Sequence, residues 1–187
     1  MPYQPPPDLA GMSLAEIAEA VAARKLPPVE EWNPDNTGES GMRIAADGTW
    51  YHDGSPITRP AMVRAFAGLL NREPDGSYWL VVPYQKLRIE VEDACFQAVD
   101  VRRVDGDLAF RLDTDELIVA GPDHPLRAEG DPDLPALYLT VRRGCEARLN
   151  RSTYEQLVHI ALDEKENGEV TDLTVTSGDA AFPLQPV

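Results

Sequence analysis

The sequence has few lysines, only two cysteines and no long apolar run. The two cysteines, Cys95 and Cys145, are 50 residues apart and form no CxxC pattern, so we expect reduced, semi-buried thiols in a cytoplasmic protein. No stretch approaches the ~18 apolar residues of a membrane span. The N-terminus begins Met-Pro-Tyr-Gln and has no basic n-region or apolar h-region, so we do not expect a signal peptide.

The familiar catalytic motifs are also missing. The sequence contains no G-x-S-x-G elbow, no Walker loop, no GxGxxG and no HExxH. Its three histidines, His52, His124 and His159, fall in unrelated contexts. We therefore predict a non-enzymatic protein with no cofactor and no metal site. An enzymatic alternative, with His124 as acid/base and Asp123 as its orienting group, lacks an identifiable nucleophile.

The net charge of −15 restricts the kinds of partner that we expect the protein to bind. Nucleic acid polymers and anionic membranes both attract basic surfaces, so neither is expected to bind. The cations are mostly arginines, whose planar guanidinium groups suit carboxylates and phosphates. A small anionic ligand therefore remains a reasonable partner, whereas the sequence does not reveal the oligomeric state.

Two segments 92 residues apart share an apolar pattern at positions i, i+3, i+4, i+7 and i+8. The first predicts a helix near Pro60–Arg72, preceded by Arg59, and the second a helix near Ser152–Lys165, preceded by Arg151. The match reflects either chance convergence on an amphipathic helix or an internal duplication, and the matched arginines favour duplication. A duplicated chain has a seam between its halves, where pockets often form. We also expect each of these arginines to brace its helix start against the sheet.

The remaining pattern is that of strands separated by Asp-Gly turns. Short alternating or apolar runs predict strands, and Ser13-Leu14-Ala15-Glu16 predicts a capped N-terminal helix. Residues 86–92 alternate strictly, which places Arg88 and Glu90 on the opposite face from the apolar residues of this predicted strand. Residues 128–135 are expected to form a surface loop. The order of strands, helix and strands predicts an α+β fold of two related halves with antiparallel strands and one main helix each. The expected parts are an N-terminal arm and short helix (1–26), a first α+β repeat (27–94) and a second α+β repeat (95–187).

Two groups of polar residues are candidates for binding. One is the stiff loop Gly121–Arg127, which follows a predicted strand and carries an acid, an imidazole and a guanidinium. The other is a set of cations near the ends of predicted elements, which together could form an anion site. Trp50 could add a stacking face. The residues expected to bind the ligand are Arg43, Trp50, Arg59, Lys86, Asp123, His124 and Arg127.

Several of these segments resemble a bacterial family called domain of unknown function 1285. The resemblance begins at Met42-Arg43-Ile44, Asp47-Gly48-Thr49-Trp50 and Gly54-Ser55-Pro56-Ile57, continues through Val91-Glu92-Asp93 and residues 120–127, and covers roughly residues 27–185. It implies a duplicated α+β fold whose C-terminal half is similar to pleckstrin-homology domains. It also implies a small, nucleotide-like ligand between the halves and an association with bacterial signalling.

The sequence thus favours a cytoplasmic binding protein that holds a small anionic, nucleotide-like ligand at the seam. The alternative is a protein-interaction module that uses a sheet edge or the Pro-rich N-terminal arm.

Overall fold

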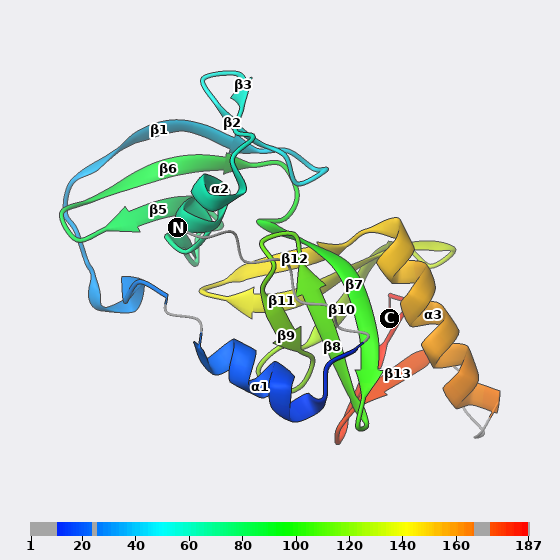
Figure 1. The fold of residues 1–187 in the computed structure, drawn as a ribbon. Coiled ribbons are helices and arrows are strands. Elements are labelled where there is room, and N and C mark those ends of the chain that lie inside the picture. The colour runs from blue at the N-terminus through cyan, green and yellow to red at the C-terminus, as the bar shows by residue number, and fades with distance from the viewer. Residues whose placement is uncertain (1–10, 24–25, 167–172, 187) are drawn as a thin grey trace. The chain divides into compact units, whose positions relative to one another are not determined.

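The computed structural model describes residues 11–23, 26–166 and 173–186 (Figure 1). The chain forms two compact units. The N-terminal unit comprises Lys25–Gln97 together with Val141–Ala147, and the C-terminal unit comprises Met1–Arg24, Ala98–Thr140 and Arg148–Val187. The segment Val141–Ala147 thus belongs to the N-terminal unit although it lies far along the chain.

The N-terminal unit contains a six-stranded sheet with the order β3-β2-β1-β6-β5-β4. Neighbouring strands pair antiparallel except β1 and β6, which run parallel. Alternation along β6 directs Leu87 and Ile89 to one face of the sheet and Arg88 and Glu90 to the other. The strands are β1 (Thr37–Ile44), β2 (Trp50–His52), β3 (Ser55–Pro56), β4 (Leu70–Arg72), β5 (Tyr78–Val82) and β6 (Gln85–Val91).

Helix α2 (Pro60–Ala67) packs on the apolar face of this sheet. It starts readily because Pro60 at its first position has a φ suited to a helix and needs no hydrogen-bond acceptor. The Trp50 ring stacks on Phe66 of the helix at a centroid distance of 6.4 Å. Trp50, Ile44 and Leu70 are almost completely buried, so they form the core of the unit.

The turn between β11 (Leu134–Arg142) and β12 (Cys145–Leu149) is held in the N-terminal unit by Arg143. Arg143 and Gly144 both have positive φ, 50° and 74°, as a tight hairpin turn with two central residues requires. The Arg143 side chain is only 5% exposed. Its guanidinium donates to the carbonyl oxygens of Pro27 and Gly68, each at 2.8 Å, and pairs with Glu30 at 2.6 Å.

The C-terminal unit holds most of a second sheet, with the order β10-β11-β12-β7-β8-β9. Its large buried side chains include Leu108, Phe110, Leu139 and Leu157. The strands besides β11 and β12 are β7 (Phe96–Val104), β8 (Asp107–Leu112), β9 (Leu117–Val119) and β10 (Leu126–Asp131).

Two helices and a small hairpin complete the C-terminal unit (Figure 1). The predicted capping box of α1 (Leu14–Ala23) is confirmed: the Ser13 N–H donates to Glu16 at 2.7 Å, and the Glu16 N–H donates to Ser13 Oγ at 3.3 Å. Ile17 of α1 is buried against Ala109 and Leu117. Helix α3 (Arg151–Glu166) packs beside β13 (Thr174–Ser177), which pairs with β14 (Ala180–Pro183).

The predicted α+β fold of two related halves is confirmed, because both six-stranded sheets have the same strand order, with the first strand of each next to its sixth. The predicted equivalence of the two helices is wrong. Helix α2 follows the third strand of its sheet, whereas α3 follows the sixth strand of the other. Met62 belongs to the apolar pattern of the first predicted helix, yet it is 41% exposed and lies outside the core. The shared apolar spacing therefore reflects two amphipathic helices at different places in the fold.

Two element boundaries also differ from the predictions. Helix α2 stops at Ala67, because the chain turns at Gly68 and Leu70 begins strand β4. The segment 128–135, predicted to be a loop, instead forms the turn of the β10–β11 hairpin and the paired residues next to it. No helix in the described part of the chain is long and apolar enough to cross a membrane.

Candidate functional site

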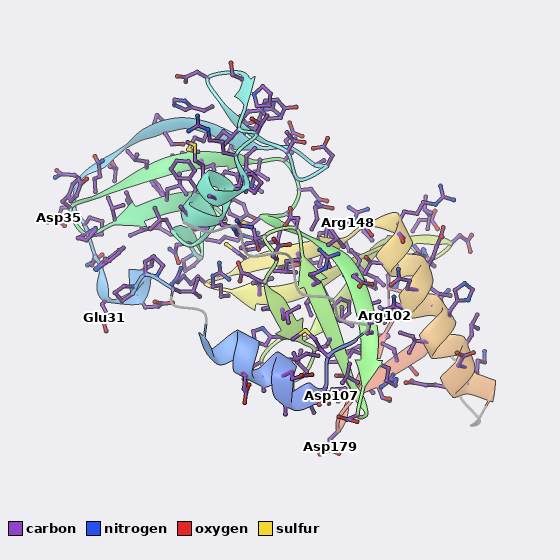
Figure 2. All side chains as sticks on the ribbon, viewed as in Figure 1. Glu31, Asp35, Arg102, Asp107, Arg148 and Asp179 are labelled. Atoms are coloured by element: carbon purple, nitrogen blue, oxygen red, sulfur yellow. The ribbon has the colours of Figure 1, made fainter. Side chains whose placement is uncertain are left out.

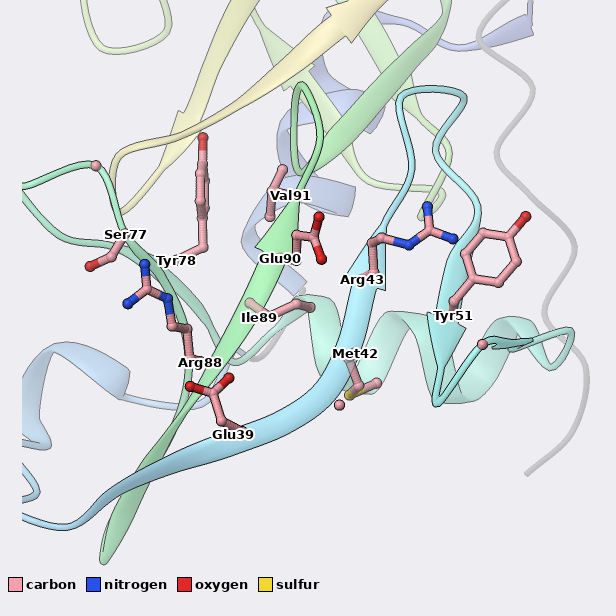
Figure 3. Close-up of a pocket in the computed structure, with 13 residues that line it drawn as sticks. Glu39, Met42, Arg43, Tyr51, Ser77, Tyr78, Arg88, Ile89, Glu90 and Val91 are labelled. Carbon is pink, nitrogen blue, oxygen red and sulfur yellow. The ribbon is translucent and has the colours of Figure 1, made fainter.

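A polar pocket of about 730 Å³ opens on the N-terminal unit (Figure 3). It lies over β1 and β6, on the side where the charged residues of these strands project, and extends to the turn before β5. Its volume falls within the range typical of small-molecule sites. The lining residues used below are Glu39, Gly41, Arg43, Tyr51, Ser77, Tyr78, Arg88 and Glu90.

A bulge in β1 shapes the floor of this pocket. Glu39 pairs with Arg88, but the next pair is Arg43 with Glu90, so four residues of β1 span two of β6. Ser40 holds the bulge in place. Its Oγ donates to the carbonyl oxygen of Arg88 at 2.7 Å and accepts the Met42 N–H at 3.0 Å.

Gly41 is the position of this bulge that most needs glycine. Its φ is +69°, and an added Cβ would collide with the carboxylate of Asp53, whose N–H donates to the Gly41 carbonyl at 2.9 Å. We expect Gly41→Ala to lower the free energy of unfolding by about 1–2 kcal/mol, because alanine in the left-handed region is strained. Urea denaturation measures this cost. Gly54→Ala is a useful comparison, because it has a positive φ of +83° but nothing within 4 Å of the added Cβ. If both variants lose the same free energy of unfolding, the collision with Asp53 adds nothing to the backbone strain at Gly41.

Four charged side chains rise from β1 and β6 into the pocket, as Figure 3 shows. Arg43 is already engaged, since it pairs with Glu92 at 2.5 Å and stacks over the Tyr51 ring at 4.3 Å. The other three, Glu39, Arg88 and Glu90, are exposed. Among the residues that the structure describes, their side chains have no hydrogen-bond or ion-pair partner. Their hydrogen-bonding capacity is therefore available to a ligand.

Tyr78 and Ser77 bound the pocket beyond Arg88. The Ser77 hydroxyl donates to Asp75 at 2.5 Å and accepts the Trp79 indole N–H at 2.8 Å, so its position is fixed. Burial raises the pKa of Tyr78 to about 12, so its phenol stays neutral at ordinary pH. This end of the pocket therefore adds neutral hydrogen-bonding groups to the charged ones.

A second hollow of about 420 Å³ lies between α2 and the apolar face of the same sheet. Its lining is mainly apolar, and two of its large hydrophobic side chains are open to solvent: Met62 is 41% exposed and Tyr84 69% exposed. This apolar groove is chemically distinct from the polar pocket.

The residues predicted to bind a ligand fall in both units. Arg43 lines the polar pocket. Trp50 does not offer a stacking face, because it is 2% exposed and packs against Phe66, and that part of the prediction is corrected. Lys86 projects from β6, but its ammonium pairs with Glu73 and lies 4.5 Å from the Trp79 ring.

The two arginines at the helix starts are not braced against the sheets. Arg59 is the N-cap of α2 and is exposed, and among the described residues its side chain has no hydrogen-bond or ion-pair partner. Arg151 begins α3 with its side chain 92% exposed and pairs only along its own helix, with Glu155 at 3.0 Å. The helix start is instead capped by Asn150, whose side chain accepts the Thr153 N–H at 2.8 Å. The bracing prediction is therefore wrong.

The three remaining predicted residues belong to the C-terminal unit. The His124 ring contacts the carbonyl oxygen of Thr140 at 3.0 Å, an interaction that fixes the turn before β10. Arg127 lies over the Tyr138 ring at 4.4 Å and pairs with Glu129. Asp123 is exposed in the same turn. These contacts give His124 and Arg127 structural partners within their own unit.

The residues predicted to bind a ligand did not include Glu39, Tyr51, Arg88 or Glu90, which line the pocket. The strict alternation of β6 was visible and correctly placed Arg88 and Glu90 on one face. The sequence carried no sign of the parallel pairing of β1 with β6, which brings Glu39 opposite Arg88. In the described part of the chain, no group of three or more His, Cys, Asp and Glu side chains is arranged to hold a metal ion.

Fold and site together define a two-unit α+β protein with a polar pocket on the N-terminal sheet. The chain belongs to the DUF1285 family. Residues 27–94 match the domain of unknown function DUF1285, N-terminal domain, and residues 95–184 match the protein of unknown function DUF1285, C-terminal domain.

Two solved structures are similar to the chain. A DUF1285 family protein from Silicibacter pomeroyi DSS-3 is 39% identical, with a TM-score of 0.76 over 94% of this chain and 96% of the other. A DUF1285 family protein from Shewanella baltica OS155 is 27% identical, with a TM-score of 0.52 over 63% of this chain and 90% of the other. No curated protein matches the sequence.

Proposed function

We propose that the protein binds a small anionic, nucleotide-like ligand in the polar pocket of the N-terminal unit, without catalysing its conversion. The observation that carries the proposal is the set of exposed charged side chains, Glu39, Arg88 and Glu90, gathered in a pocket of about 730 Å³. Exposed charges on a flat surface are common. Their placement in a pocket, without a hydrogen bond or ion pair to another described residue, supports a binding role.

The charges of the pocket select the kind of ligand. Arg88 is suited to an anionic group, because a guanidinium offers paired donors to phosphate or carboxylate. Glu39 and Glu90 accept hydrogen bonds and would repel a purely anionic ligand, so the ligand must also carry donors such as hydroxyl or amino groups. A nucleotide combines these features. The Tyr51 and Tyr78 rings offer additional apolar contact.

Screening nucleotides and sugar phosphates by thermal shift tests the proposal, with affinities then measured by calorimetry. A ligand at 100 times its Kd stabilises the folded protein by about 2.7 kcal/mol. Arg88→Met keeps the length of the side chain but removes its charge and donors. We expect it to weaken binding by about 10- to 100-fold, because a hydrogen bond to a charged group contributes roughly 1.5–3 kcal/mol.

Arg102→Met is the matched control. Arg102 lies on β7 in the C-terminal unit, with its side chain 52% exposed and only a distant contact with Asp100 at 3.9 Å (Figure 2). The control variant is expected to bind as the wild type does. The proposal fails if no anionic ligand stabilises the protein, or if Arg88→Met and Arg102→Met bind equally well.

The apolar groove supports a second candidate, a protein-interaction module. Exposed Met62 and Tyr84 beside Phe66 would accept apolar side chains of an amphipathic peptide. Fluorescence polarisation with a panel of such peptides tests it. Binding that is lost in Met62→Asp but retained in Arg88→Met would favour this function over the first, whereas no binding by any peptide would remove it.

A further inference from the structure

The two cysteines lie together although they are far apart in sequence. Cys95 precedes β7, and Cys145 begins β12. Both belong to the N-terminal unit, and both are 1% exposed. Their thiols are hydrogen-bonded to each other. Neither the pocket nor the groove uses them.

The strand arrangement fits a covalent link between them. β7 and β12 are neighbours in the sheet, and the Asn150 N–H donates to the Ala98 carbonyl at 3.1 Å. Cys95 contacts Cys145 and Ala98 contacts Asn150, so the residue numbers increase together on both segments, as they do between parallel strands. Neighbouring strands are about 4.8 Å apart. Cys95 lies one residue before β7, and a spacing of this size beside it falls within the range of about 4.4–6.8 Å found between the Cα atoms of disulfide-bonded cysteines.

The surroundings of the pair distinguish the two sulfurs. The hydrogen bond from Cys95 lowers the pKa of Cys145, and the positive charges of Arg142, Arg143 and Arg72 lower it further. The same hydrogen bond, together with burial, raises the pKa of Cys95. Cys145 is therefore the more acidic of the two thiols and the better nucleophile.

We propose that Cys95 and Cys145 are a redox-active pair that forms a reversible disulfide when a small hydroperoxide oxidises Cys145. The Cys145 thiolate attacks one peroxide oxygen, the O–O bond breaks, and the leaving hydroxide takes a proton to become water. The resulting sulfenic acid is attacked by the Cys95 sulfur, an S–S bond forms and a second water leaves. In sum, two thiols and one hydrogen peroxide give one disulfide and two waters.

Such a disulfide would act on the hairpin turn that Arg143 anchors. The Arg142 and Arg143 side chains of this turn donate to the carbonyl oxygens of Ala67 and Gly68 at the end of α2, at 3.2 and 2.8 Å. A link at Cys145 ties the turn covalently to the segment before β7. Oxidation is therefore expected to raise the temperature at which the N-terminal unit unfolds, because the unfolded chain loses freedom when a long loop is closed.

The test is to treat the folded full-length protein with hydrogen peroxide and then block the remaining thiols under denaturing conditions. We expect a loss of both free thiols, a Cys95–Cys145 linked peptide by mass spectrometry, and full recovery of the thiols after treatment with dithiothreitol. Cys95→Ser should accumulate a sulfenic acid at Cys145 that dimedone traps. Cys145→Ser should leave Cys95 unmodified under the same conditions.

The charge effect gives a test that needs no cysteine variant. Arg72 is exposed, so Arg72→Met should fold normally, yet it should slow disulfide formation several-fold. Arg102→Met, seven residues beyond Cys95 on β7, should react at the wild-type rate. The proposal is overturned if peroxide leaves both thiols of the folded wild type free, if the product is an over-oxidised single cysteine, or if Arg72→Met and Arg102→Met react equally fast.

Discussion

Replacing Trp50 with alanine is expected to lower the free energy of unfolding of the N-terminal unit by about 3–5 kcal/mol. The ring is 2% exposed and stacks on Phe66, so its removal leaves a cavity between the sheet and α2. Urea denaturation followed by circular dichroism measures the cost. A tryptophan that served mainly as a ligand platform would instead be replaceable with little loss of stability.

Trp79→Ala is the matched comparison for Trp50→Ala. Trp79 is only partly buried on β5, where its indole N–H donates to Ser77 and Lys86 lies over its ring. Its replacement should cost less than half as much, because partly exposed side chains leave smaller cavities. Similar losses in the two variants would contradict the placement of Trp50 in the core.

Arg143→Met is expected to cost about 2–4 kcal/mol, although the position is a hairpin turn. The substitution leaves the carbonyl oxygens of Pro27 and Gly68 without the donor that now meets each at 2.8 Å. The cost comes from the lost hydrogen bonds to a charged group and from two partly buried carbonyl oxygens that are left without a donor. Thermal and urea denaturation measure it. Arg148→Met, which removes an arginine from β12 in the C-terminal unit, serves as a comparison.

The pair formed by Arg143 and Glu30 adds a dependence on pH. The hydrogen bond from Arg143 lowers the pKa of Glu30 below its ordinary value of 4.5. A carboxyl whose pKa is lowered in the folded state stabilises that state above its unfolded pKa, and the contribution is lost as the pH falls through the folded pKa. The stability difference between wild type and Glu30→Gln should therefore be constant from pH 6 to 8 and shrink below about pH 4.5. A difference that does not shrink at all on acidification would argue against the pair.

Local sequence signals predicted much of the fold because they act over a few residues. Ser13 and Glu16 specified a helix start, and Asp47-Gly48 specified the β1–β2 turn. The alternation of β6 assigned its faces. Each of these signals depends on neighbours in the chain, so each could be recognised without the tertiary structure.

The failures arise where distant segments decide the outcome. Leu70 continued the helical spacing of α2, yet it pairs with Leu80 in the sheet. Strand β10 lies at a sheet edge and is mostly polar, so its sequence shows no apolar alternation. Without that signal, most of the strand was predicted to be a surface loop. The candidate pocket depends on the register between β1 and β6 across a bulge, which no short stretch of sequence encodes. Trp50 was wrongly predicted to stack on a ligand, because an aromatic residue after a turn can either pack in the core or line a binding site.

Hydrogen–deuterium exchange with and without a saturating ligand from the screen tests the central proposal most directly. Binding in the polar pocket should slow exchange of the amides in residues 39–43, 76–78 and 88–91, the segments that line it. It should leave the turn at residues 121–125 unchanged. Slower exchange confined to that turn, or to α2 and the apolar groove, would contradict the placement of the ligand in the polar pocket.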